Sequence, residues 1–404
     1  MKVFINIATV FIAIIVLAAV FRQAGRSASL RNWLCSTALA AESASTKSTQ
    51  AEWVPVRDAS LVIPANSSLD FSGLWPSHPA GALGRVVANS EGKLAFEKKP
   101  TERAKFHCAS LSWSPASGSF PDKQTADLYA EQLRVHGYNV ARFHFVEAIL
   151  MTDRDEDFDY DPDQLDRFRY LLAALKRRGI YWIIDAMASS NGAFGSIYPD
   201  RWADIYDLRL KIHFDAEARQ HWSRLVKTIL GTVNPYTELR PIEDPALALV
   251  VLANENGLEF SSILYQDKTG VAYPPTLLPG FNNWLSTKYG GTEALRAAWG
   301  QLSKDESIED GTVQLPESRE ERGPRMRDLQ SFFRAIEGDT FDWLSHEIRE
   351  LGYAGLVTQY NSWVTSETVF SRDNLPVTRA CHQLSHITAA ARKIAARKFR
   401  AVLS

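Results

Sequence analysis

The sequence has few features of a metal site, a disulfide framework or a nucleic-acid-binding surface. Its 404 residues include three cysteines, Cys35, Cys108 and Cys381, which lie far apart and lack zinc-site spacing. We expect no disulfide framework, so the fold must depend on its hydrophobic core. The net charge is -2, and the body of the chain has no basic patches, so neither nucleic acid nor an acidic partner is predicted.

The composition is that of an ordinary globular protein, with 45% hydrophobic and 23% charged residues. A chain of 404 residues forms one large domain or two ordinary ones. Its 11 tryptophans are a high number, which is a weak indication of a polysaccharide enzyme.

The N-terminal segment predicts export. Residues 3–21 are almost entirely apolar, with Lys2 before them and Arg22 after them. This run is long enough to span a bilayer and also suits a signal peptide. We therefore expect residues 1–40 to be a signal peptide or a membrane anchor, and the protein to be periplasmic, secreted or anchored. Any membrane contact should be made through this segment.

The next two segments differ from the rest of the chain. Residues 41–52 are small and polar, which is typical of a linker. Residues 53–104 contain short β-type runs broken by Pro, Gly, Asn and Ser. They predict a small β-rich preamble that packs outside the active site.

From residue 105 the pattern predicts alternating strands and helices. Strands are expected at five places: 105–113, 138–146, 180–187, 245–255 and 354–363. Nearly continuous apolar strands separated by amphipathic helices indicate a parallel sheet covered by helices, either doubly wound or a (β/α)8 barrel. No Gly-x-Gly-x-x-Gly or Walker loop follows a strand. Polar residues at the ends of five strands favour the barrel.

The predicted fold is thus α/β, an incomplete (β/α)8 TIM barrel of about five βα units over residues 105–380. Three motifs carry a resemblance to a family. "GYNVARFHF" (137–145) resembles the Gly-x-Asn-x-x-Arg second strand of clan A glycoside hydrolases of the cellulase or family 5 type. "LANENG" (252–257) resembles the Asn-Glu that ends their fourth strand. "NNWLSTKYGGTEALRAAWG" (282–300) looks like the helix after that strand in β-galactosidase-like members.

The resemblance implies a glycosidase acting on a poly- or oligosaccharide, without a cofactor. Glu255 would protonate the leaving oxygen and then activate water as the base of a retaining enzyme. Asn254 would bind the sugar hydroxyl beside the reacting carbon, and Arg142 would keep the nucleophilic carboxylate ionised. The alternatives are that Glu255 caps a helix or lies in a solvated loop, and that Arg142 forms a structural ion pair.

Other polar and aromatic residues at the predicted strand ends are candidates for sugar contacts. They are His144, Trp113, Tyr360, Asn361 and Trp363. Aromatic faces stack on sugar rings, although each of these residues could instead serve packing alone. Asp185 ends the third strand, but Met187 stands where many relatives have a histidine, so Asp185 could be a loop cap.

An acidic run at residues 153–166 has some of the alternation of a calcium loop. Pro162 stands where such a loop needs glycine, and Phe168 where it needs the closing glutamate. We therefore expect a helix N-terminus after an acidic loop, and no metal.

The C-terminal part departs from the family pattern, because the resemblance requires a nucleophile after the seventh strand and we find five strands. No acidic residue follows Asp373, and residues 381–404 are basic. This tail is either an amphipathic helix or, as we expect, the mark of a truncated or frame-shifted copy with little glycosidase activity. The rival hypotheses are a non-catalytic carbohydrate-binding remnant and an unrelated α/β enzyme. We expect a monomer.

Overall fold

The computed structural model describes residues 62–112, 119–152, 154, 156–188 and 207–359. The predicted export segment, the linker and the basic tail lie outside these residues, as do Trp113, Tyr360, Asn361 and Trp363. No helix in the described part is both long and apolar enough to cross a membrane.

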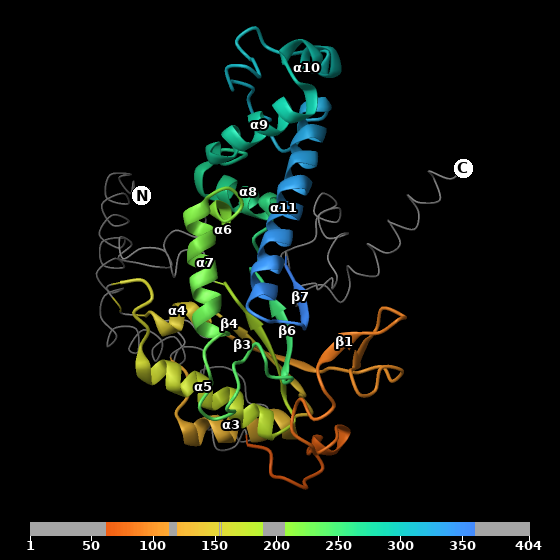
Figure 1. Cartoon of the computed structure of the whole chain (residues 1–404), viewed down its shortest axis with the longest axis vertical. Helices are drawn as coiled ribbons and strands as arrows, with labels where there is room; N and C mark the ends of the chain where they lie inside the picture. The colour runs from red at the N-terminus through yellow and green to blue at the C-terminus, as the bar shows by residue number, and fades with distance from the viewer. Residues whose placement is uncertain (1–61, 113–118, 153, 155, 189–206, 360–404) are drawn as a thin grey trace, which may run out of the picture. The chain divides into compact units, whose positions relative to one another are not determined.

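Five parallel strands form the central sheet (Figure 1). They are β3 (Cys108–Ser112), β4 (Val140–His144), β5 (Tyr181–Asp185), β6 (Leu247–Val251) and β7 (Leu356–Thr358). They pair in the order in which they follow one another along the chain, with no reversal of direction. A doubly wound sheet reverses its strand order at a switch point, whereas a barrel does not. The described part is therefore an incomplete TIM-barrel fold, as predicted.

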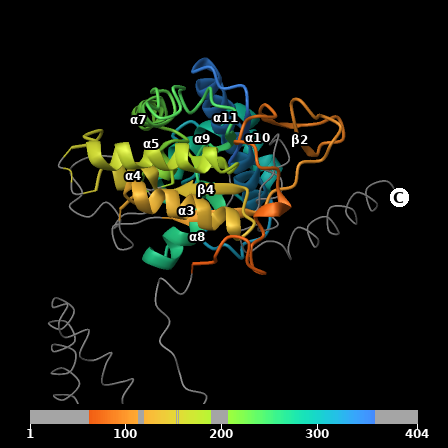
Figure 2. The ribbon, with the colours of Figure 1, turned by 90° about the horizontal axis from the view of Figure 1, so that it is seen from below.

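Three helices follow the strands, and each begins at an aspartate. They are α3 (Lys123–Val135), α5 (Pro162–Arg177) and α7 (Ala216–Ile229). The side chains of Asp122, Asp161 and Asp215 accept hydrogen bonds from backbone N–H groups of the first turn, which would otherwise lack a partner. The acidic run thus leads into a helix N-terminus. Figure 2 shows α3 and α5 side by side.

The two faces of the sheet differ, because successive side chains of a strand point in opposite directions. Phe143 of β4 points toward the helices and meets Phe168 of α5 with ring centroids 5.6 Å apart. Arg142 therefore points to the other face, which it shares with Asp185 through the strand register. The inner face of the sheet is thus polar near its carboxyl edge.

A helical module lies between β6 and β7. It comprises α8 (Leu258–Thr269), α9 (Leu278–Tyr289), α10 (Thr292–Trp299) and the 27-residue α11 (Pro324–Glu350). The first half of α11 packs in a core with α9 and α10, and its second half packs in the core of the sheet. At 1.5 Å per residue α11 is about 40 Å long, and Figure 1 shows α9 and α10 around its far end. Two shorter helices, α4 (Val146–Leu150) and α6 (Asp207–Lys211), complete the fold near the sheet.

The described part of the preamble, residues 62–104, packs against the amino-terminal ends of the strands. Its strands β1 (Val86–Ala88) and β2 (Leu94–Phe96) form an antiparallel pair. Arg85 donates to the carbonyl groups of Ile242 and Glu243, just before β6. Trp75 donates to the carbonyl of Gly137, just before β4. These contacts lie at the edge opposite the carboxyl ends of the strands, and turns make up more of the segment than strands do.

Candidate functional site

Buried polar side chains meet at the carboxyl ends of β4, β5 and β6. The guanidinium of Arg142 donates to both carboxylate oxygens of Asp185, at 3.0 and 2.8 Å. One of its nitrogens also donates to the amide oxygen of Asn254 at 2.8 Å. His144 Nδ1 lies 2.7 Å from the second carboxylate oxygen of Asp185. The parallel register places these residues at one edge, so the sequence spacing of 112 between Arg142 and Asn254 becomes a direct contact.

Asp185 is the centre of this network. Its side chain is fully buried, and burial by itself would raise its pKa. The hydrogen bond and charge of His144, followed by the charge of Arg142, outweigh burial and hold the pKa of the Asp185 carboxyl below its usual value. The network therefore stabilises an ionised carboxylate, which in turn orients Arg142 and His144.

Asp185 does not fit the interpretation that it caps a loop, because its partners are side chains of neighbouring strand residues. Arg142 forms the ion pair that the sequence left as an alternative, and it also reaches the predicted sugar-binding residue Asn254. The sequence did not reveal Asp185 as the shared partner of Arg142 and His144, because the register of β4 against β5 creates the contact.

Glu255 lies in a turn that begins after β6. The turn leaves the strand geometry, and Glu255 has a φ of 52°, in the left-handed region. Asn254 and Glu255 therefore do not have to point to opposite faces, as neighbouring residues of a strand do. If both are to face one ligand, the chain must leave the strand geometry here, and this turn does so. Its side chain is 27% exposed, whereas Asn254 is buried. Glu255 is thus partly accessible to solvent and follows directly on a buried residue of the network.

Arg209 is a cation beside Glu255 that the sequence did not point to. Its guanidinium lies 3.8 Å from a Glu255 carboxylate oxygen and donates to the Ala188 carbonyl at 2.6 Å. The Ala188 N–H in turn donates to the buried carboxylate of Glu147 at 2.7 Å. The segment after β5 is therefore held between Glu147 and Arg209, next to Glu255.

The residue after Glu255 has an unusual environment. The side chain of Asn256 is fully buried, and neither its amide nitrogen nor its amide oxygen has a hydrogen-bond partner in the structure described above. Such a group costs about 1–3 kcal/mol relative to a satisfied one. Its backbone carbonyl, by contrast, accepts a hydrogen bond from the ring of His213 at 2.8 Å.

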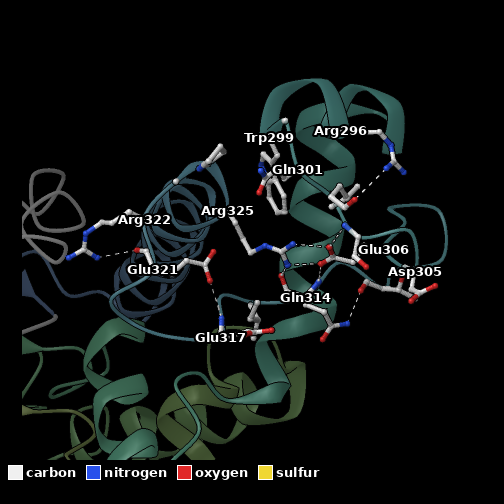
Figure 3. Close-up of a pocket in the computed structure, with 17 residues that line it drawn as sticks. Arg296, Trp299, Gln301, Asp305, Glu306, Gln314, Glu317, Glu321, Arg322 and Arg325 are labelled. Carbon is white, nitrogen blue, oxygen red and sulfur yellow. Dashed lines mark hydrogen bonds and ion pairs between the residues drawn. The ribbon is translucent and has the colours of Figure 1, made fainter.

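Arg142 and Glu255 lie at the same edge of the sheet. If the chain were an unrelated α/β enzyme, these two residues could lie at opposite ends of the sheet, and they do not. A cavity of about 910 Å³ lies elsewhere, between α10, the loop after it and the start of α11 (Figure 3). There Arg325 binds Glu306 through two hydrogen bonds of 2.5 and 2.8 Å, over the ring of Trp299. No strand-end residue lines this cavity, so it is separate from the candidate site. Among the residues that the structure describes, no group of three or more His, Cys, Asp or Glu could hold a metal ion.

Comparisons with solved structures find glycoside hydrolases. The chain is similar to the β-galactosidase of the psychrophilic Marinomonas ef1, with 19% identity and a TM-score of 0.42 over 62% of this chain and 36% of that one. It is also similar to the endo-1,4-β-D-mannanase of Thermotoga petrophila RKU-1, with 15% identity and a TM-score of 0.31 over 67% and 83% of the two chains. For the family 5 mannosidase of Rhizomucor miehei, identity is 11% and the TM-score 0.33, over 68% and 72%.

The matched part thus spans about a third of the length of the β-galactosidase. No family model matches the sequence, and no curated protein matches it.

Proposed function

We propose that the chain is a glycoside hydrolase that acts on an O-glycosidic bond of a poly- or oligosaccharide. The observation that carries the proposal is the position of Glu255, which is partly exposed at the carboxyl edge and follows an asparagine bound by Arg142. Barrel enzymes place their chemistry at this edge. The other sugar contacts proposed are His144, Trp113, Tyr360, Asn361 and Trp363.

In this proposal Glu255 is the general acid that protonates the leaving oxygen, and afterwards the base that activates water. Asn254 would bind the sugar hydroxyl beside the reacting carbon, and the hydrogen bond from Arg142 to its amide oxygen fixes the orientation of its side chain. A retaining reaction needs a second carboxylate about 5 Å from the acid. Asp185 is unsuited to that role, because it is fully buried and both of its oxygens accept hydrogen bonds from Arg142.

The second candidate is carbohydrate binding without turnover. It is favoured by the same observation on Asp185, whose buried carboxylate is bound by Arg142 and His144 and does not supply a second catalytic carboxylate. We further propose export through residues 1–40, which would bring a monomeric protein to glycans outside the cytoplasm.

The test compares the full-length protein with its Glu255→Gln variant on aryl glycosides and polysaccharides, with glycan binding measured by calorimetry in parallel. We expect little turnover from the wild type. General acid catalysis contributes about 10²–10⁴ in rate, so any hydrolysis that Glu255 supports should fall at least about 100-fold in kcat/KM in the variant. The control is Glu243→Gln, which changes a partly exposed glutamate that precedes β6 at the opposite edge.

Equal hydrolysis by wild type and Glu255→Gln would contradict the role of Glu255. Glycan binding that persists in both proteins without any turnover would establish the binding candidate instead.

A further inference from the structure

The turn that carries Glu255 has a strained backbone. Glu255 has a φ of 52°, a conformation that crowds the Cβ atom of any residue other than glycine. Such strain persists only where the surrounding structure imposes it. Two hydrogen bonds hold the start of the turn. The indole N–H of Trp222 donates to the Leu252 carbonyl at 2.8 Å, and the backbone N–H of Asn254 donates to the Met187 carbonyl at 2.7 Å.

After Glu255 the contacts come from His213 and α11. The ring of His213 lies 2.8 Å from the Asn256 carbonyl through Nε2 and 2.9 Å from the Thr340 hydroxyl through Nδ1. A carbonyl oxygen can only accept, so Nε2 carries the proton. Burial keeps the ring neutral, so Nδ1 is the acceptor and the hydroxyl of Thr340 donates to it. His213 therefore connects α11 to the backbone carbonyl of Asn256, the residue after Glu255.

A second side chain of α11 reaches the same turn. Glu337 accepts a hydrogen bond at 2.6 Å from the N–H of Leu258, the first residue of α8. The residue before it, Gly257, provides no side-chain cap, so a carboxylate from another helix takes that place. Glu337 and Thr340 are three residues apart and therefore share one face of α11.

We propose that Glu337 and Thr340 of α11, the latter through His213, are positioning residues that hold the Glu255 turn in its reactive conformation. The catalytic part of this inference rests on the proposed function. The structural part, that these contacts hold residues 252–258, does not.

The experiment uses two substitutions in the full-length protein, each with a matched control. Thr340→Val removes the hydroxyl at nearly constant volume, and Thr340→Ser restores it. Glu337→Gln removes the charge that strengthens the bond to Leu258. Its control is Glu347→Gln, the same change on the same helix, at a carboxylate that binds Ser223 of α7 instead. Amide hydrogen exchange of residues 252–258 is measured together with kcat and KM on the best aryl glycoside.

We expect exchange in residues 252–258 to become roughly tenfold faster in Thr340→Val and Glu337→Gln, as for the loss of one net hydrogen bond. We expect kcat to fall by a similar factor while KM stays within about twofold, because the contacts position the acid and do not bind substrate. Thr340→Ser and Glu347→Gln should behave as wild type in both measurements.

Unchanged exchange in both variants would overturn the proposal whatever the activity. Faster exchange with unchanged kcat in an active enzyme would overturn the positioning role. If wild type shows no turnover, the proposed function fails, and the exchange data alone decide whether α11 holds the turn.

Discussion

His213 should make the folded protein sensitive to acid. Burial is the main cause that lowers the pKa of His213 from 6.5 to about 4. The hydrogen bond to the Asn256 carbonyl raises the pKa and so opposes burial in part, and the charge of Arg219 makes a smaller contribution that lowers it. In the unfolded chain the ring titrates near 6.5. Above that pH the ring is neutral in both states and has no effect on pH dependence.

Between pH 6.5 and pH 4 the unfolded state takes up a proton that the folded state does not. Stability should therefore fall with decreasing pH by as much as 1.36 kcal/mol per pH unit from this one group. The pKa difference between 6.5 and about 4 corresponds to a total loss of about 3 kcal/mol. Most of that loss should already be present at pH 4.5.

The assay is urea unfolding of wild type and His213→Gln at pH 7 and pH 4.5. Glutamine cannot take up the proton, so the variant should lose about 2–3 kcal/mol less than wild type between these pH values. The same substitution at the partly exposed His78 controls for the substitution itself. If wild type and His213→Gln lose the same free energy of unfolding, the buried neutral state assigned to His213 is wrong.

Three further changes test the strand-end network and the turn. Asp185→Asn should destabilise the protein by about 3–5 kcal/mol in urea unfolding, because it leaves Arg142 charged and buried without its ion pair; a cost below 1 kcal/mol would contradict this. Glu255→Gly should be about 1 kcal/mol more stable than Glu255→Ala, because both lack the carboxylate and only glycine adopts a φ of 52° without strain; equal melting temperatures would show that the turn relaxes. Asn256→Leu should leave the melting temperature unchanged or raise it, because it replaces buried polar atoms that have no described partner; a drop of more than about 5 °C would refute that account.

The order and type of the strands could be predicted from sequence because they depend on local patterns. Apolar runs such as 247–251 are buried along their whole length, and Asp161 followed by Pro162 is a local signal for the start of α5. The predicted strands were longer than those observed, since 245–255 includes the turn in which Glu255 lies.

The partners of the site residues could not be predicted in the same way. Arg142 and Asn254 were found through short motifs, but His213 and Thr340 are 127 residues apart and belong to no motif. Arg209 of α6 likewise lies beside Glu255, although the two residues are far apart in the sequence and belong to no common motif. Contacts of this kind depend on how helices pack, and a sequence pattern of one segment does not contain that information.

The length of α11 has a consequence for how the chain unfolds. Met326, Leu329 and Phe332 bury the first half of this helix among α9 and α10, while Phe341 and Leu344 bury its second half against the sheet. A helix is a cooperative structure whose hydrogen bonds each depend on their neighbours. Loss of either core would therefore fray the shared helix and expose apolar surface in the other.

The helical module and the sheet should for this reason melt in a single calorimetric transition, although each has a hydrophobic core of its own. The same coupling gives the module a thermodynamic link to the Glu255 turn. A substitution in the core around Phe332, on the half of α11 that packs with α9 and α10, can weaken the site without touching any residue in it.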